Sequence, residues 1–221
     1  AFRPYARKFA EVLGSLAERA GEGASPLLVP REEVKKIHLV LCTSDRGLCG
    51  GFNTNLIEKA EAFMRQRAGA GVEFSLTAFG RKGRNWSRKS DAALADEHIG
   101  IMGTAIKFNE ASTAGRKLVQ GYLDGSTDEV VIIYAEFLSN ARQVPVLKKL
   151  LPIPPIEKAE AETTAEAAYL PEHICEPSAA ELLGEMLPRN VYVQIFSALL
   201  ETSASEHAAR MTAMGSATTN A

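Results

Sequence analysis

The chain has 221 residues, of which 46% are hydrophobic and 24% charged, so it is neither wholly disordered nor collagen-like. Its net charge of −2 is divided unevenly, because residues 1–90 sum to +7 and residues 91–221 to −9. A net-acidic chain is a poor general nucleic-acid binder, no apolar run approaches the roughly 20 residues that span a bilayer, and we expect no secretion signal.

Helix and strand patterns alternate from the first residues onward. Residues 4–20 carry apolar side chains at three- and four-residue spacing, which predicts a helix with one apolar face. The apolar positions are Phe9, Val12, Leu13 and Leu16. After a Gly/Pro-rich linker over residues 21–30, the apolar run over residues 36–43 predicts a strand that is buried on both faces.

The middle of the chain continues this alternation. The patterns predict a helix over residues 54–66, a strand over 72–79, a short strand near 98–102, a helix over 104–123, and strands over 128–138 and 144–153. Such alternation is typical of an α/β domain with a mainly parallel sheet. Residues 156–168 are acidic and Ala-rich, and we expect an exposed, mobile loop there, with a solvated helix as the alternative.

The last 44 residues, 178–221, contain no strand-like run and predict a long helix. Ser178 and Glu181 have the spacing of a capping box at its start. Pro188 is expected to kink or interrupt the helix, because proline lacks a backbone N–H and clashes with the preceding turn. From Arg189 onward the helix would span about 50 Å, which is longer than one domain needs for its own core. We therefore expect it to leave its domain and pack against another helix.

A Gly-rich turn, TSDRGLCGGFN over residues 43–53, lies between the first predicted strand and the next helix. Such a turn can cradle phosphate with free backbone amides. Its spacing, however, matches neither a P-loop nor a dinucleotide-binding fingerprint. A purely structural role, with glycines allowing a tight turn, is therefore favoured, and nucleotide binding by a Rossmann-like domain remains the alternative.

No catalytic or metal site stands out. Cys42 and Cys49 do not have redox or zinc spacing, so we interpret them as a buried small side chain and a turn residue. Five basic residues around Trp86, within residues 81–89, are interpreted as a solvated helix face, with nucleic-acid binding as the alternative. Glu206 and Arg210 have the spacing and order of an intrahelical ion pair.

Five segments, in order, resemble the gamma subunit of F-type ATP synthase, of the bacterial kind. They are RPYA at 3–6, TSDRGLCGGFNTNL at 43–56, KFNE at 107–110, EPS at 176–178 and ASEHAARMTAMGSATTNA at 204–221. The resemblance implies a Rossmann-like α/β domain over residues 31–175. It also implies parts of the two helices of an antiparallel coiled coil, over residues 1–20 and 178–221. Both helices are shorter than the family's, so the chain is expected to be truncated at each end.

The function that this resemblance implies is mechanical. Such a subunit is the central rotor stalk that couples rotation of the membrane c-subunit ring to conformational change in the catalytic alpha/beta hexamer. It is itself non-catalytic and has no cofactor or metal. The implied partners are the alpha and beta subunits, an epsilon-like subunit on the α/β domain, and the c ring, with no nucleic acid. The implied location is peripheral, on the cytoplasmic face of the bacterial inner membrane.

The resemblance also implies roles for particular residues. Glu206, Arg210, Met211 and Met214 match shaft positions that contact the beta subunit, and Cys175 and Glu176 match the foot that faces the c ring. Residues 47–53 match the family's signature loop, to which we assign a structural role. The residues of this signature loop are Gly47, Leu48, Cys49, Gly50, Gly51, Phe52 and Asn53.

Overall fold

Five strands form one sheet in the order β3-β2-β1-β4-β5. The computed structural model describes residues 2–21, 23–69, 71–155 and 178–219. The strands are β1 (Lys36–Cys42), β2 (Glu73–Phe79), β3 (Ala92–His98), β4 (Glu129–Ser139) and β5 (Arg142–Leu151). All neighbours are parallel except β4 and β5, which form an antiparallel hairpin. The prediction of an α/β fold with a mainly parallel sheet is therefore confirmed.

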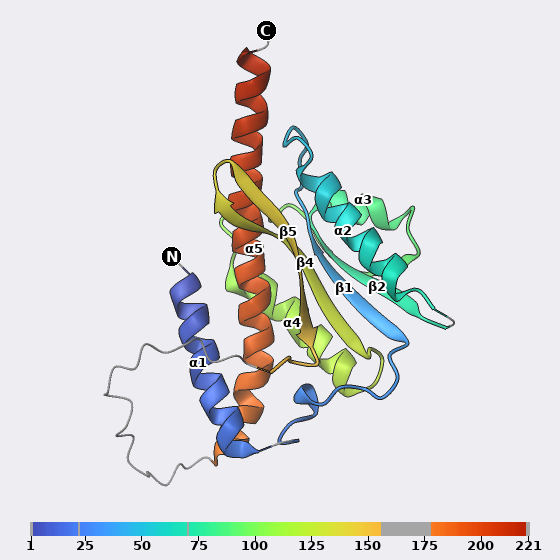
Figure 1. The fold of residues 1–221 in the computed structure, drawn as a ribbon, viewed down its shortest axis with the longest axis vertical. Coiled ribbons are helices and arrows are strands. Elements are labelled where there is room, and N and C mark those ends of the chain that lie inside the picture. The colour runs from blue at the N-terminus through green and yellow to red at the C-terminus, as the bar shows by residue number, and fades with distance from the viewer. Residues whose placement is uncertain (1, 22, 70, 156–177, 220–221) are drawn as a thin grey trace.

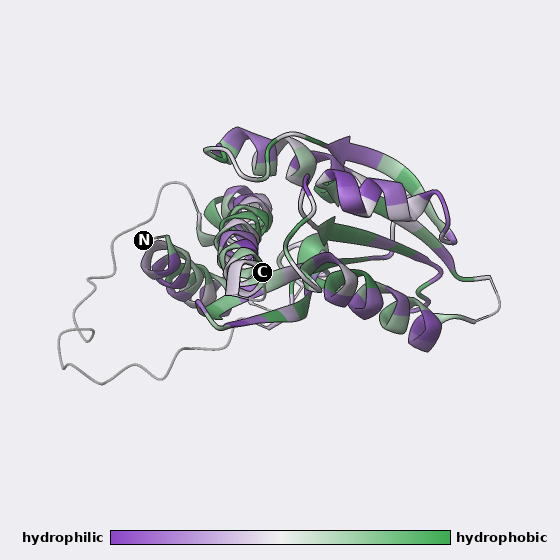
Figure 2. Ribbon diagram, turned by 90° about the horizontal axis from the view of Figure 1, so that it is seen from above, coloured by the Kyte–Doolittle hydropathy of each residue, from purple (hydrophilic) through white to green (hydrophobic). Residues whose placement is uncertain are grey.

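Helices cover both faces of this sheet (Figure 1). They are α1 (Arg3–Ala20), the short 3-10 helix η1 (Pro26–Leu28), α2 (Phe52–Arg67), α3 (Arg81–Ser87), α4 (Phe108–Leu123) and α5 (Ala179–Thr219). α2 and α3 lie on one face, while α4 and α5 lie on the other. Viewed from above, α5 lies between α1 and the α/β layers (Figure 2).

Strand β1 is buried on both faces, as its apolar run predicts. Leu39 and Leu41 belong to the core beneath α2, whereas Val40 and Cys42 belong to the core beneath α4 and α5. A strand at the centre of a parallel sheet with helices on both faces has no solvated side, which explains why its sequence does not alternate.

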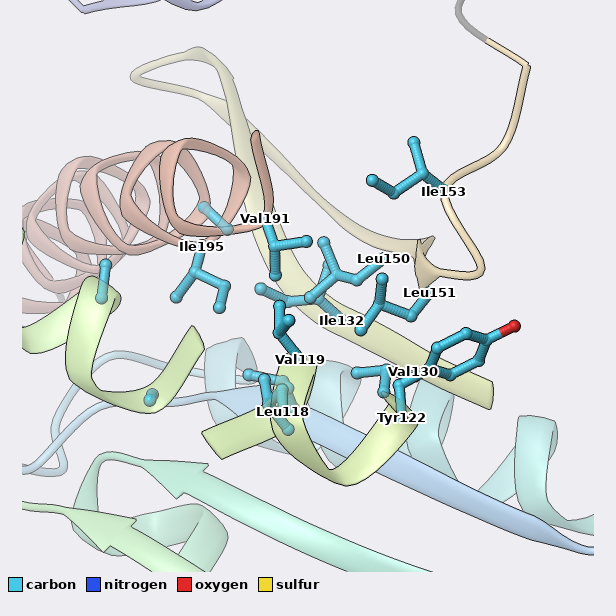
Figure 3. Close-up of a cluster of buried hydrophobic side chains, with 14 of the residues drawn as sticks. Leu118, Val119, Tyr122, Val130, Ile132, Leu150, Leu151, Ile153, Val191 and Ile195 are labelled. Atoms are coloured by element: carbon cyan, nitrogen blue, oxygen red, sulfur yellow. The ribbon is translucent and has the colours of Figure 1, made fainter. Parts of the chain in front are cut away.

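The larger core lies between the sheet and α4 and α5 (Figure 3). Leu118 and Val119 of α4 and Val191 and Ile195 of α5 approach Ile132 of β4 from two directions. These side chains are nearly or completely removed from solvent. Burying a large apolar side chain contributes about 1.5–3 kcal/mol, so this contact fixes the first half of α5 on the domain.

Helix α5 is one continuous element of 41 residues. Its start has the predicted capping box, in which Ser178 N–H donates to Glu181 Oε2 at 3.0 Å and Glu181 N–H donates to Ser178 Oγ at 3.2 Å. Pro188 lies inside the helix without interrupting it. Leu187 and Val191 are fully buried on either side of the proline, and their packing holds the helix together there.

Helix α1 runs antiparallel to α5 (Figure 1). Near its start, Phe2 packs edge-on against Phe196, with ring centroids 4.9 Å apart, and Arg3 forms an ion pair with Glu201. Leu13 of α1 is fully buried against the larger core, and Phe9 and Leu16 are partly buried there. Val12, which the spacing places on the apolar face, is exposed instead.

The third strand lies earlier than its sequence suggests. β3 covers Ala92–His98, not the predicted residues 98–102. It is an edge strand whose side chains are mostly exposed or half-buried, so it lacks the apolar run on which the prediction depended. The helix predicted from residue 104 begins at Phe108.

Within the described ranges, no helix has the length and apolar character needed to cross a membrane. The predicted loop over residues 156–168, and the predicted foot residues Cys175 and Glu176, lie outside the described residues.

Candidate functional site

The Gly-rich turn after β1 is built by hydrogen bonds to the neighbouring strand and helix. Thr43 Oγ1 donates to Phe79 O at 3.1 Å and accepts from Gly83 N–H at 2.8 Å. Gly80 follows β2 with φ +94°, and a Cβ there would lie 2.3 Å from Thr43 O. Glycine is therefore required at this position, because both its backbone angle and the close approach exclude a side chain.

Asp45 joins three segments that lie far apart in the sequence. Its Oδ1 accepts from Arg81 N–H at 3.0 Å, and its Oδ2 accepts from Gly100 N–H and Met102 N–H, each at 3.0 Å. One carboxylate thus ties the turn after β1 to the segments after β2 and β3. Backbone hydrogen bonds to a charged acceptor are stronger than neutral ones, so Asp45 anchors this end of the sheet.

Asn53 closes the signature loop from inside. Its Oδ1 accepts from Ser44 N–H at 2.9 Å, and its Nδ2 donates to Ser44 Oγ at 2.8 Å and Cys49 Sγ at 3.3 Å. Cys49 is buried, whereas Leu48 has φ +63° and is 77% exposed. The loop therefore holds a rigid polar interior and presents one apolar side chain outward.

Glu206 and Arg210 form the predicted ion pair, and the structure adds a contact that the sequence does not suggest. Arg210 Nη2 lies 2.6 Å from Glu206 Oε1 and also donates to Gly47 O at 3.3 Å. Glu206 is 1% exposed, and its Oε2 has no hydrogen-bond partner among the described residues. Arg210 thus links α5 to the signature loop and is the nearest cation to the carboxylate, whose other oxygen lies 4.0 Å from His207 Nδ1.

Helix α5 occupies the position where an open α/β sheet binds a ligand. Helices α2 and α4 cover opposite faces, so the topological switch point lies between β1 and β4, and ligands in such folds bind at the carboxyl ends of these strands. Here, Thr202 and Ser205 of α5 lie against Ala135 at that end of β4. The structure therefore does not favour the nucleotide-binding alternative.

Two hollows remain between the signature loop and α5. One, of about 260 Å³, is lined by residues of the loop and the start of α2, by the β4–β5 hairpin, and by Ala209 and Ala213. The other lies along the exposed part of α5, between Leu48 and Met214. Met211 is 74% exposed and Met214 is also exposed, so both predicted contact methionines are available to a partner.

Two further candidates, the basic segment around Trp86 and the thiol of Cys42, do not form a binding or reactive site. Trp86 of α3 donates its indole N–H to Glu61 Oε1 at 2.9 Å and packs against the smaller core, so it is not a free stacking surface for a base. Cys42 is fully buried, and this burial raises the pKa of its thiol, which keeps it protonated. Over the residues that the structure covers, no group of three or more His, Cys, Asp or Glu could hold a metal ion.

Comparison with known proteins agrees with this architecture. The family model described as ATP synthase matches residues 1–221. The chain is 58% identical over 219 residues to the ATP synthase gamma chain of Desulfosudis oleivorans, covering 98% of this chain and 74% of that one. The chain belongs to the ATP synthase gamma chain family.

A second relative and one solved structure extend this comparison. Identity to the ATP synthase gamma chain of Desulforapulum autotrophicum is 55% over 221 residues, with 98% of this chain and 74% of that one covered. A chain of the Tetrahymena thermophila mitochondrial ATP synthase central stalk and c ring shares the fold, with a TM-score of 0.64 at 24% identity. That match covers 99% of this chain and 98% of the solved one.

The main feature that sequence reasoning missed is the bridge between the gamma-family signature loop and α5. The Gly-rich turn and the Glu206–Arg210 pair are both evident in the sequence, but 163 residues separate Arg210 from Gly47. One signal was available in the sequence. Glu206 follows a run of small residues suited to close packing, which indicates that the ion pair lies against another part of the chain and is not on a solvent-exposed helix face. That signal does not name the loop as the contact.

Proposed function

We propose that this gamma-family chain is the central rotor-stalk subunit of a proton-translocating F-type ATP synthase. In this role it couples rotation of the c-subunit ring to conformational change in the alpha/beta hexamer. The family membership and the gamma-chain names of its relatives support the proposal. We assign the subunit no catalytic step of its own, because α5 packs against Ala135 at the carboxyl end of β4, where an open α/β sheet would hold a ligand.

The observation that carries the mechanical role is the division of α5 into two parts. As far as Ala208, the helix contributes buried residues to the core, whereas residues 211–219 are almost all exposed. A helix of 41 residues spans about 60 Å, so it can reach well beyond the α/β domain. A rigid element fixed at one end can deliver the rotation of a domain to a distant partner.

The proposed partner contacts follow from this division. We infer that Arg210, Met211 and Met214 meet the beta subunit, and that Glu206 acts there by holding Arg210. Cys175 and Glu176 are proposed to face the c ring, and an epsilon-like subunit is proposed to dock on the α/β domain. The complex would place the chain peripherally, on the cytoplasmic face of the bacterial inner membrane.

Purification of the tagged chain from its native host tests this proposal. We expect alpha, beta, epsilon-like and c subunits to copurify with it and the complex to hydrolyse ATP. Recovery of the chain without alpha and beta would contradict the proposal.

Calorimetry with ATP, NAD and FMN tests the nucleotide-binding alternative separately. We expect no heat of binding to the purified chain at micromolar concentration. Micromolar binding that Gly50→Val abolishes would instead support that alternative.

A further inference from the structure

Strand β4 extends beyond the end of its neighbour β1, and its backbone needs other partners there. The pairing of β1 with β4 ends at Leu41 opposite Ile133. Two residues later, Ala135 lies opposite Pro145 of β5, but its N–H and C=O groups point away from that strand and toward α5. Ala135 is buried, so water does not satisfy its backbone N–H and C=O groups.

Helix α5 supplies these partners through its side chains. Ala135 N–H donates to Thr202 Oγ1 at 3.3 Å, and Ser205 Oγ donates to Ala135 O at 3.2 Å. Both hydroxyl residues are fully buried. Two residues along the strand, Phe137 N–H donates to Glu201 Oε2 at 2.9 Å. We call Glu201, Thr202 and Ser205 the β4 clamp.

Arg3 holds the carboxylate of the β4 clamp in place. It pairs with both oxygens of Glu201 and donates to Phe137 O at 2.6 Å. Glu201 is thus bonded to α1 and to β4 at once. The clamp therefore connects both long helices to the same end of the sheet.

The β4 clamp differs in kind from the packing below it. From Leu183 to Leu199, α5 contacts the domain mainly through apolar side chains, and such contacts have little directional preference. Hydrogen bonds to fixed backbone groups require the side chains at one axial and one rotational position. A shift of α5 by one residue turns it by about 100° and leaves both groups of Ala135 buried without partners.

The position of the β4 clamp matters as much as its chemistry. It is followed along α5 by the contact of Arg210 with the signature loop, and residues 211–219 beyond that contact are almost all exposed. We propose that Glu201, Thr202 and Ser205 are positioning residues that fix the rotation of α5 relative to the α/β domain. Turning of the domain then reaches the exposed end of α5 without slippage. This inference rests on the proposed rotor function.

The test uses the assembled ATP synthase in inverted membrane vesicles, with Thr202→Val and Ser205→Ala combined in its gamma subunit. Valine keeps the shape of threonine but removes the acceptor. We expect ATP hydrolysis to continue while the number of protons pumped per ATP hydrolysed falls by about twofold or more, because displaced positions of α5 become populated. Phosphate release and acidification of the vesicle interior are measured on the same preparation.

Two matched variants separate the β4 clamp from general effects on α5. Thr202→Ser keeps the hydroxyl and is expected to retain the normal ratio of protons to ATP. Thr218→Val removes a hydroxyl that donates only to Met214 O on the same exposed part of the helix, and it is also expected to leave the ratio unchanged. A fall in the ratio with Thr218→Val as large as that of the double variant would overturn the proposal.

Hydrogen exchange at the Ala135 amide, measured in the same complex, reports on the β4 clamp directly. If the amide exchanges at least about tenfold faster in the double variant but the pumping ratio stays normal, the positioning role is wrong. If the double variant fails to assemble, Thr202→Val alone is judged by the same criteria. If the unmodified complex hydrolyses ATP but pumps no protons, the proposed rotor function fails rather than the β4 clamp.

Discussion

At the carboxyl end of the sheet, single polar side chains connect several segments of the chain through hydrogen bonds to their backbones. Asp45 accepts hydrogen bonds from three backbone amides on two other segments, and Asn53 fills the interior of the signature loop. Arg210 joins this loop to α5 through Gly47 O. Each of these side chains is hydrogen-bonded to the backbone of another segment, so its loss removes a link between segments as well as a hydrogen bond.

Removal of Arg210 is expected to be costly, because it takes the nearest cation away from the buried carboxylate of Glu206. We predict that Arg210→Ala lowers the free energy of unfolding by about 3 kcal/mol, whereas Glu206→Gln, which removes the buried charge, lowers it by less. Urea unfolding of both variants at neutral pH measures this order. A smaller loss for Arg210→Ala than for Glu206→Gln would show that the carboxylate has another source of compensation.

A second prediction at the residue scale concerns pH and His38. Its Nδ1 lies 2.7 Å from Ser75 Oγ and its Nε2 lies 2.8 Å from Thr77 Oγ1. Burial lowers the pKa of His38 to about 4, although the negative charge of Asp96 acts to raise it. In the unfolded chain this imidazole has a pKa near 6.5, so the unfolded state binds the proton more readily than the folded state does. The stability that neutral His38 contributes is complete above pH 6.5 and is lost as the pH falls toward 4.

Between pH 7.5 and pH 5 this loss amounts to about 2 kcal/mol. In His38→Gln we expect the difference in unfolding free energy between these two pH values to be smaller by about that amount. Urea unfolding at both pH values measures it in the two proteins. An identical pH dependence would mean that the imidazole does not stay neutral in the fold.

At the scale of elements, the close contact between α4 and α5 depends on one glycine. A Cβ at Gly115 would lie 2.3 Å from Cδ1 of Tyr192, so the two helices touch with no room for a methyl group. Gly121, on the same helix, has only an ordinary contact of 3.5 Å with Thr127 Oγ1. The apolar core that fixes α5 on the domain therefore depends on a small residue that no apolar pattern identifies.

These two glycines give a matched pair of variants. We predict that Gly115→Ala lowers the free energy of unfolding by about 1–3 kcal/mol, because α4 and α5 must separate. Gly121→Ala is expected to raise it by up to about 1 kcal/mol through helix propensity. Thermal or urea unfolding distinguishes them, and equal effects of the two substitutions would contradict the close contact at Tyr192.

At the scale of the whole molecule, the chain combines a rigid α/β body with a helix that emerges from it (Figure 1). The body ends in a layer of polar contacts, formed by the signature loop, Arg210 and the β4 clamp. Beyond that layer, α5 presents apolar side chains to solvent, most prominently Met211. Exposed apolar groups on a rigid support are typical of a surface that meets a partner.

This surface yields a prediction for the complex. We predict that Met211→Asp weakens association with the alpha/beta hexamer about tenfold, while the free energy of unfolding of the chain changes by less than about 0.5 kcal/mol. Gln66→Asp, at an exposed position of α2, serves as the charge control and should not alter association. Titration of each labelled variant into purified alpha/beta hexamer measures its affinity. Unchanged binding by Met211→Asp would remove this residue from the interface.

Local patterns predicted most of the elements, because helix caps and buried strands depend on neighbouring residues. The capping box at Ser178 and the two-sided burial of β1 were both evident in this way. The edge strand β3 was misplaced because only one of its edges is paired and most of its side chains meet solvent, so it carries no apolar signature.

The sequence by itself therefore determined the α/β class, the long final helix and the family, since each depends on periodicity or on contiguous motifs. Only the tertiary structure decided that the Gly-rich turn contacts the Glu206–Arg210 pair, and that α5 packs against the carboxyl end of β4. Those contacts join residues more than 60 positions apart, between a backbone carbonyl or amide and a side chain. Every residue but proline has the same backbone groups, so no residue type marks in advance where such a side chain will find its partner.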